Sequence, residues 1–463
     1  MKKLWKVLAC ALCAILLGTA TVGCEYKQGG VENAEYTVDF NLPVTTTAEI
    51  KVLIPDNDVE RKIMDALIKG FNEKYPLIKI TKNFLTITNY NSTIVRQSSA
   101  EVLPEIIWTN SSNYYFLINN GVALNLDIFT EDAEKAGVFD YDADFSDDFR
   151  SMGLLSGVRY AVPRTVDSVV TFYNTKILAD AKVDMAKIKN GWTWDDLMDV
   201  CETLRKYYDA QGKTNYYPIA PNLTWESVAW PIIKSLGGEL INENGEFALT
   251  EEMSNKVVAF VKKMVEKRYI PDKNADAANF ESGTGALLFQ SASVDKYENM
   301  ASTKGKFNVV SFPLINGENS AIGNGFAGYA INKQVLKDQN KLNAACAFMA
   351  YLMSYDGQQI LTDSESENGG GLANPSIRND LSVLNKDANW HKTYSSYLNI
   401  EAYTYGAQYK ISQEFLANVN AEFTSDIVNA LNVYVGDYAI RKSANEAYQA
   451  LKGDIDEAFN SVV

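Results

Sequence analysis

Histidine and cysteine are scarce in this sequence. His391 is the only histidine among 463 residues, so mechanisms that need two histidines are excluded, and a Ser-His-Asp triad would depend on this one residue. Beyond the first 23 residues the cysteines are Cys24, Cys201 and Cys346. They are too widely spaced for the clustered ligands of a structural zinc site. We expect no metal and no cofactor, and we expect Cys201 and Cys346, each inside an apolar helical pattern, to be core thiols.

Long apolar runs are also scarce. The only pronounced one, Val7–Leu17, is too short to span a bilayer and follows three lysines, as in a secretory leader. It leads to Val22-Gly23-Cys24, which resembles the bacterial lipobox. We predict a lipoprotein signal peptide over 1–23, lipidation of Cys24, and a flexible tether over 24–47 that holds the body at the extracellular face of the cytoplasmic membrane. The alternative is an ordinary secretory signal that is cleaved nearby.

Positive charge is in deficit. The chain has 43 Lys and Arg against 58 Asp and Glu, a formal net charge of −15. Nucleic-acid binding needs clustered Lys and Arg, so we expect no nucleic-acid partner. Hydrophobic residues make up 46% of the chain, which is enough for well-formed cores. The length suggests two or three domain-sized units, and we expect a monomer.

The first part of the body alternates strand and helix patterns. Ile50–Ile54 reads as a strand, Asn57 and Glu60 as a helix start of the capping-box type, and Ile78–Phe84 as the next strand. A helix over Asn89–Ala100 and a strand ending at Trp108 follow. This spacing predicts βαβ units on a parallel sheet, and so the α/β class.

The stretch Gly157–Lys176 organises the rest of the chain. Two extended runs, Val158–Val162 and Val166–Tyr173, are joined through Pro163, which cannot donate to a strand ladder. Arg164 and Asp167 lie in the middle of this stretch. We predict that the chain crosses here from one lobe to another and that these polar groups meet a ligand. The alternative is an ordinary strand with a partly solvated face.

Several phrases resemble, in order, the landmarks of the family 1 extracellular solute-binding proteins, the maltose-binding-protein-like sugar receptors of ABC importers. The resemblance covers about residues 48–375. The phrases are Phe71–Ile80, Pro104–Trp108 with Gly121–Leu126, the crossover ending in Tyr173–Leu178, Thr193–Leu197, Gly237–Glu239, Phe280–Phe289, Gly325–Ile331, Ala344–Leu352 and Gly357–Gln359. The last ninety residues read as helices over Phe415–Val435 and Ala444–Phe459 and carry none of these landmarks.

The resemblance implies a two-lobe periplasmic-binding-protein fold, type II-like, with discontinuous lobes joined by a hinge of crossing segments. The N-lobe would comprise 48–163 plus 312–371, and the C-lobe 164–311 plus 372–463. Gly369–Gly371 suits the third crossing, because glycine tolerates unusual backbone angles. The implied function is capture of a carbohydrate in the interlobe cleft, without catalysis, and its delivery to the membrane subunits of an ABC permease.

Ligands of open α/β sheets bind at the carboxyl ends of strands, and a sugar needs aromatic faces together with carboxylates, amides or Arg. Among the polar residues Asp167 comes first. For Trp108 the alternative is a place in the core. Trp225 and Trp230 do not share one helix face, so one should be core, and the resemblance favours Trp225 for the cleft. Phe326 stands where relatives often have a stacking Trp. The full predicted set is Asp56, Trp108, Asn110, Arg164, Asp167, Trp225, Glu226, Phe326 and Tyr329.

Two other functions stay open on the sequence alone. The same fold could bind a metal ion, a polyamine or a peptide, and pairs such as Tyr114-Tyr115 are of the kind that iron receptors use. A secreted glycoside hydrolase needs only a suitably spaced pair of carboxylates, which the sequence could supply, although it shows no hydrolase motif.

Overall fold

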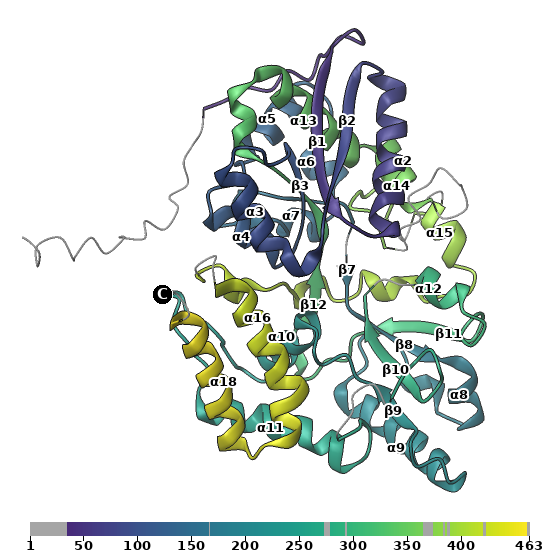
Figure 1. Cartoon of the computed structure of the whole chain (residues 1–463). Coiled ribbons are helices and arrows are strands. Elements are labelled where there is room, and N and C mark those ends of the chain that lie inside the picture. The colour runs from purple at the N-terminus through teal and green to yellow at the C-terminus, as the bar shows by residue number, and fades with distance from the viewer. Residues whose placement is uncertain are drawn as a thin grey trace, which may run out of the picture. The chain divides into compact units, whose positions relative to one another are not determined.

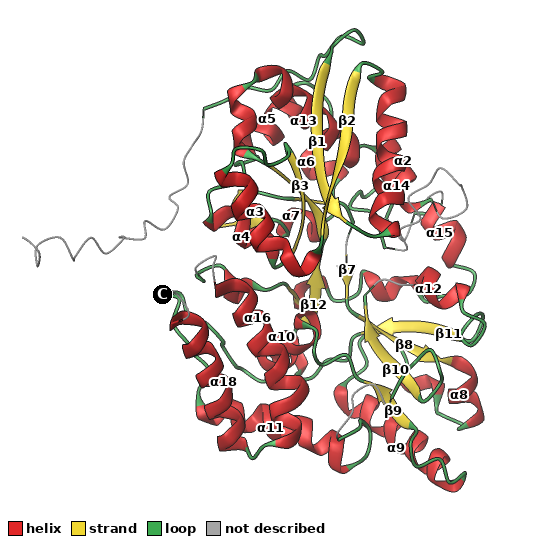
Figure 2. Cartoon of the chain, in the orientation of Figure 1, coloured by secondary structure: helices red, strands yellow, loops and turns green. Residues whose placement is uncertain are grey.

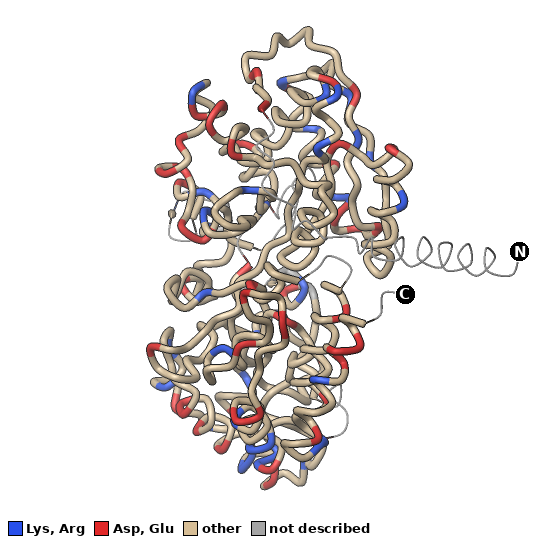
Figure 3. Tube along the Cα trace, turned by 90° about the vertical axis from the view of Figure 1, so that its left-hand side faces the viewer, with Lys and Arg blue, Asp and Glu red and all other residues tan. Residues whose placement is uncertain are grey.

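The computed structural model describes residues 35–165, 167–272, 278–291, 294–363, 374–382, 385–386, 389–419 and 423–460. Its strands form two main sheets, each surrounded by helices (Figures 1 and 2). We call the elements around the five-stranded sheet the N-lobe and those around the four-stranded sheet the C-lobe. Acidic and basic residues are interspersed over both (Figure 3).

The N-lobe sheet has the order β2-β1-β3-β13-β6. β1 pairs in parallel with β2 and β3, which confirms the predicted βαβ arrangement, and β13 is antiparallel to β3 and β6. The strands are β1 (Ala48–Pro55), β2 (Ile78–Leu85), β3 (Ile106–Asn110), β6 (Val162–Pro163) and β13 (Ala327–Ile331), and the helices are α2 (Asp58–Lys74), α3 (Tyr90–Ser99), α4 (Asn113–Asn119), α5 (Asp127–Lys135), α6 (Tyr141–Asp144), α7 (Asp147–Ser151), α13 (Gln339–Met353) and α14 (Tyr355–Thr362).

The C-lobe sheet has the order β11-β8-β10-β9, with β8 antiparallel to both of its neighbours. Thr193 and Asp196 form a complete capping box at the start of α9, as the Thr193–Leu197 phrase suggests. The strands are β8 (Val170–Asn174), β9 (Tyr217–Ala220), β10 (Gly285–Gln290) and β11 (Phe307–Ser311), and the helices are α8 (Thr175–Asp180), α9 (Trp194–Ala210), α10 (Glu226–Ser235), α11 (Glu251–Glu266), α12 (Val294–Asn299), α15 (Asn389–Tyr394), α16 (Thr424–Val433), α17 (Ala439–Arg441) and α18 (Ala444–Asn460).

Short strands between the two sheets carry the chain from lobe to lobe. β7 (Asp167–Ser168), β12 (Ile322–Gly325) and β14 (Lys410–Ile411) form a small sheet of order β14-β12-β7 (Figure 1). The extended runs predicted around Pro163 are therefore broken into pieces: two residues each in β5 (Val158–Arg159), β6 and β7, then β8. The chain leaves the N-lobe sheet after β6, which ends at Pro163, and returns to it between β12 and β13.

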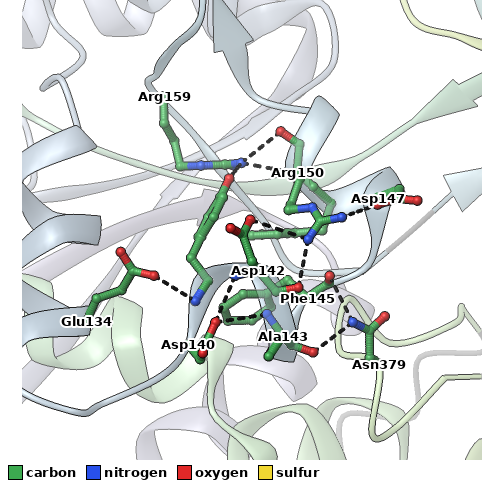
Figure 4. A network of polar contacts seen from close by, with 11 residues as sticks. Glu134, Asp140, Asp142, Ala143, Phe145, Asp147, Arg150, Arg159 and Asn379 are labelled. Atoms are coloured by element: carbon green, nitrogen blue, oxygen red, sulfur yellow. Dashed lines mark hydrogen bonds and ion pairs between the residues drawn. The ribbon is translucent and has the colours of Figure 1, made fainter.

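The second and third crossings lie later in the chain than the sequence suggests. Residues 312–321 still belong with the C-lobe, because Leu314 N–H donates to the Trp192 carbonyl (3.0 Å) and Ala321 N–H donates to Ser235 Oγ (2.8 Å). Residues 376–379 still belong with the N-lobe, since Asn379 Nδ2 donates to the Phe145 carbonyl (3.0 Å; Figure 4). Gly369–Gly371 lie outside the described residues.

Buried cationic side chains fix the segments that lead to the first crossing. Arg159 is 2% exposed and donates from Nη1 to the carbonyls of Met152 (3.0 Å) and Ala161 (3.1 Å). Its guanidinium also reaches the α6–α7 region, in the network of Figure 4. Arg164, directly after the crossing, forms a buried two-pronged ion pair with Glu60 in the first turn of α2. Asn57 caps α2 as predicted, but the Glu60 carboxylate binds Arg164 and does not complete a capping box.

The first described residues run along the N-lobe. Tyr36 Oη donates to the Asn125 carbonyl (2.6 Å), Val38 N–H donates to Asp132 Oδ2 (2.9 Å), and Asp39 N–H donates to Asn343 Oδ1 (3.1 Å). Phe40 packs against Phe129 of α5. Although we expect a flexible tether over 24–47, residues 36–40 are thus held against α5 and α13.

The ion pair between Glu60 and Arg164 gives a first prediction. Replacing Glu60 by Gln leaves the Arg164 charge buried without its partner, which should lower the free energy of unfolding by about 3–5 kcal/mol. The measurement is guanidinium denaturation followed by circular dichroism. The control is Glu49→Gln, which removes an exposed pair with Lys79 (2.9 Å) and should leave the free energy of unfolding nearly unchanged, because solvent screens the pair. Equal effects of the two variants would contradict the role that we give to the buried pair.

Candidate functional site

The N-terminus of α4 approaches the point where the chain returns to the N-lobe. Asn110, at the end of β3, accepts backbone N–H groups from Ser112 (3.1 Å) and Asn113 (2.8 Å) through Oδ1. Ser111 Oγ accepts the Phe326 N–H (2.7 Å), and Ser111 N–H donates to the Phe326 carbonyl (3.1 Å). The end of β3 is therefore tied to the link between β12 and β13.

The first turn of α10 meets this region from the C-lobe. A Cβ placed on Gly325 would lie 2.9 Å from Ser111 Oγ and 3.7 Å from Ser227 Oγ, so the two hydroxyls flank Gly325. The Glu226 side chain lies near Ser112 of the N-lobe and near Asn432 at the end of α16, and burial raises the pKa of its carboxyl. Glu226 thus lies where the two lobes meet.

Residues 410–414 complete the contact between the lobes. Lys410 Nζ is buried and binds Asp148 of α7 (2.6 Å), and burial lowers the pKa of this amine. Ser412 lies near Tyr115 of α4, while Gln413 Nε2 donates to Ser227 Oγ (3.2 Å). Trp230 Nε1 donates to Glu414 (3.3 Å), whose pKa is raised by burial. We call the region formed by Ser111, Ser112, Tyr115, Trp225–Ser227, Phe326, Ser412–Glu414 and Asn432 the junction.

A π-helix holds the loop before α10 in place. Residues Tyr434–Tyr438 continue α16 with π-helical turns, and Gly436 lies within them. A Cβ on Gly436 would collide with Thr224 Cγ2 as it is placed here, so the helix and the loop pack closely at this glycine. Because Thr224 directly precedes Trp225, the C-terminal helices set the position of the Trp225 loop.

A cavity among the described residues lies elsewhere, in the N-lobe. It measures about 830 Å³ and is lined by N-lobe residues such as Gly70, Tyr75, Tyr351 and Asp363. None of the predicted binding residues lines it. We therefore place the candidate site by the side chains that converge from both lobes and leave this cavity aside.

Searches for metal sites and membrane spans give negative results over the same residues. In the described part of the chain, no group of three or more His, Cys, Asp and Glu side chains is placed to hold a metal ion. No helix there has the length and apolarity needed to cross a membrane.

Comparison with protein families identifies the family of this chain. The family described as bacterial extracellular solute-binding protein matches residues 57–359. The chain belongs to this family. A search of curated protein sequences finds no match to this solute-binding protein.

Solved structures agree on the fold of this solute-binding protein. It is similar to the sugar-binding protein MalE of Xanthomonas citri, with 15% identity and a TM-score of 0.68 over 89% of this chain and 98% of that one. It is similar to an ABC substrate-binding protein of Listeria monocytogenes in complex with cycloalternan (17% identity, TM-score 0.67, 90% and 99% covered). The cyclic alpha-maltosyl-1,6-maltose binding protein of Arthrobacter globiformis gives 16% identity and a TM-score of 0.67 over 90% and 100%. These matches confirm the predicted two-lobe fold.

The predicted binding residues fall into two groups. Asn110, Glu226 and Phe326 lie at the junction, and Trp225 directly precedes Glu226; Trp225 and Glu226 are half-buried, while Phe326 is buried against Tyr114. Trp230 is the buried member of its pair with Trp225. Trp108 is 7% exposed and packs on Tyr90, and its Nε1 has no hydrogen-bond partner among the described residues.

The other predicted residues lie around the first crossing or on the surface. Arg164 binds Glu60, and the buried Tyr329 lies beside it. Asp167, opposite Gly325 in the β7–β12 pair, accepts from Asn374 Nδ2 (3.0 Å), and burial raises the pKa of its carboxyl. Asp56 is exposed and pairs with Arg61. The structure thus engages Arg164 and Asp56 in ion pairs within the protein.

Sequence reasoning misses several junction residues. Ser112, Gln413 and Asn432 lie in no phrase that points to a ligand, and the last two belong to the C-terminal ninety residues without landmarks. Their one sequence signal is weak: Ser111 and Ser112 directly follow a predicted buried strand, where ligand loops are expected.

The raised pKa of Glu226 predicts a pH-dependent stability difference. Between the ordinary value of 4.5 and its raised value, the folded chain holds a proton that the unfolded chain has lost, so stability falls as pH rises. Glu226→Gln should therefore melt higher than the native protein at pH 7, by on the order of 1 °C, and this gain should vanish below the ordinary pKa. The exposed Glu243→Gln serves as control in differential scanning calorimetry. A gain that is constant with pH would contradict the assignment.

The close contact at Gly436 predicts a pairwise effect. Gly436→Ala should lower the free energy of unfolding by about 1–3 kcal/mol, because the new methyl group collides with Thr224. Thr224→Ala in the same chain should restore most of the loss, which a double-mutant cycle measures. Gly453→Ala in α18, where a Cβ meets nothing within 4 Å, should instead be neutral or stabilising. Additive losses would show that the two residues do not collide.

Proposed function

We propose that this protein is the substrate-binding component of an ABC importer and that it captures a carbohydrate, most simply an oligosaccharide, between its lobes. Closure of the lobes around the solute would present a form that docks on the membrane permease. In this proposal the protein performs no chemistry on its ligand. The observation that carries the proposal is the convergence of aromatic and polar side chains from both lobes at the junction.

The side chains at the junction suit a neutral polyhydroxylated ligand. A sugar offers apolar faces for stacking and a rim of hydroxyls that both donate and accept hydrogen bonds. Trp225 supplies a half-buried aromatic surface, and Glu226, Ser112 and Gln413 supply acceptors and donors within one region. Asp167, Asn110 and Phe326 extend this set along the crossing strands, and we keep Trp108 and Tyr329 as its supporting aromatic residues.

The ligands of structurally similar proteins support the choice of a carbohydrate. Relatives in fold are described in complex with cycloalternan, with maltose and with maltotriose. At 13–17% identity the side chains that select one sugar over another differ between these proteins, so each has its own specificity.

The proposal also includes the place of action. Membership of an extracellular family agrees with export of the chain. Val22-Gly23-Cys24 supports cleavage after residue 23 and attachment of lipid to Cys24, which would retain a monomeric receptor at the outer face of the cytoplasmic membrane. Cys24 and the leader lie outside the described residues. The lobe boundaries, with crossings at Pro163 and near Gly325, form part of the same proposal.

An oligosaccharide panel tests the function. The mature protein should show a rise in melting temperature and a change in intrinsic tryptophan fluorescence with at least one sugar of a panel that includes maltose and maltotriose. Trp225→Ala should then raise the dissociation constant at least about tenfold, because the aromatic surface for stacking is lost. The exposed aromatic Tyr355→Ala is the matched control and should bind like the native protein.

Three results would count against the proposal. No thermal or fluorescence response to any sugar, with a response to a metal ion, a polyamine or a peptide, would favour another solute. Release of reducing sugar would indicate an enzyme. A native dissociation constant in Trp225→Ala would move the site away from the junction.

A further inference from the structure

Gln413 carries a buried polar atom that the described chain leaves without a partner. The residue is 1% exposed, and its Nε2 donates to Ser227 Oγ at 3.2 Å. Its Oε1 accepts no hydrogen bond from any described residue. Exchanging the amide oxygen and nitrogen would still leave one buried polar atom without a hydrogen-bond partner, because Ser227 contacts only one end of the amide.

An unpaired buried amide oxygen is costly, so its place in the structure matters. Folding strips water from the group, and without a new hydrogen bond this desolvation is not offset. Proteins tolerate such groups where a ligand supplies the missing partner, at sites that trade stability for binding. The question is then whether Gln413 lies where a ligand can reach it.

The neighbours of Gln413 place it between the lobes. Ser412 lies near Tyr115 of the N-lobe helix α4, and Glu414 accepts from Trp230 of the C-lobe helix α10. Gln413 itself contacts Ser227 in the first turn of α10. A separation of the lobes in a two-lobe binding protein would expose residues in this position.

Asn432 repeats the pattern on the adjacent residue of α10. Its side chain lies near Glu226, while its Oδ1 is buried and has no partner among the described residues. Two amide side chains from the C-terminal ninety residues thus each lie beside a polar side chain in the first turn of α10 and keep an oxygen unpaired. Their oxygens call for hydrogen-bond donors that carry no negative charge, because Glu226 and Glu414 lie nearby and Lys410 is already paired with Asp148.

We infer that Gln413 is a ligand-contacting residue whose amide binds a hydroxyl of a neutral saccharide, with Asn432 placed to do the same beside it. The inference rests on the proposed function and extends it to the C-terminal segment and to the charge of the solute. A hydroxyl fits because it can donate to the unpaired oxygen and still accept another hydrogen bond. An acidic sugar would bring its carboxylate towards Glu226 and Glu414.

The decisive comparison uses Gln413→Leu, Gln413→Glu and the exposed control Gln211→Leu in the full mature chain. Calorimetric titration is carried out with maltotriose and with the neutral sugar that gives the largest thermal shift. Gln413→Leu should weaken binding at least about tenfold while the melting temperature without ligand stays unchanged or rises, since a buried unpaired oxygen is removed. Gln413→Glu keeps an acceptor and should bind better than Gln413→Leu. Gln211→Leu should match the native protein.

The contrary outcomes separate the inference from the function on which it rests. Native affinity in Gln413→Leu, with sugar binding intact, would overturn the inference and leave the function standing. A lower melting temperature in both Gln413 variants, together with equal losses of affinity, would show a structural role and also overturn it. Tighter binding of a uronic-acid oligosaccharide than of any neutral sugar would reject the neutral ligand. If the native protein binds no sugar, the proposed function fails and the inference fails with it.

Discussion

The ion pair of Glu60 and Arg164 fixes the geometry on which the rest of the structure depends. It joins the first turn of α2 to the residue that follows the first crossing, and both side chains are 8% exposed. Two charges removed from water are stable only when they are well matched, so the pair tolerates little displacement. Arg164 lies three residues before Asp167, the first residue of β7. The ion pair therefore holds the start of β7, and Asp167 beside β12, in a fixed position relative to the N-lobe core. The junction can therefore change on the C-lobe side while the crossing remains in place.

Local patterns in the sequence predict much of this fold. Apolar spacing in Asp58–Lys74 and the box of Thr193 and Asp196 depend on residues a few positions apart, and both helices form. The family resemblance, in contrast, places the second and third crossings too early, after Ser311 and after residue 371. Where a segment changes lobes depends on its hydrogen-bond partners far along the chain, such as Trp192 and Phe145, and no local period records those partners.

The candidate site divides in the same way. The loop that follows β3 and the start of α10 could be predicted, because strand ends and helix starts are the usual places of ligand contacts. Gln413 and Asn432 could not be predicted, because the neighbouring residues in the sequence do not distinguish them from surface amides. Only the structure shows that their side-chain oxygens are buried. Arg164 looked like a ligand group since it lies at the crossing; its partner Glu60 is 104 positions away, and the sequence alone gave Glu60 a role in capping α2.

The docking of residues 36–40 on α5 and α13 has a mechanical consequence. A chain held anywhere before these residues would transmit its pull to the N-lobe, because Tyr36, Val38 and Asp39 are bonded there. In a tethered molecule the N-lobe would then be the fixed lobe, and the C-lobe would be the lobe that moves relative to it. Opening and closing would not stretch the segment that tethers the protein. The free energy of solute binding would then not depend on the distance between the protein and its point of attachment.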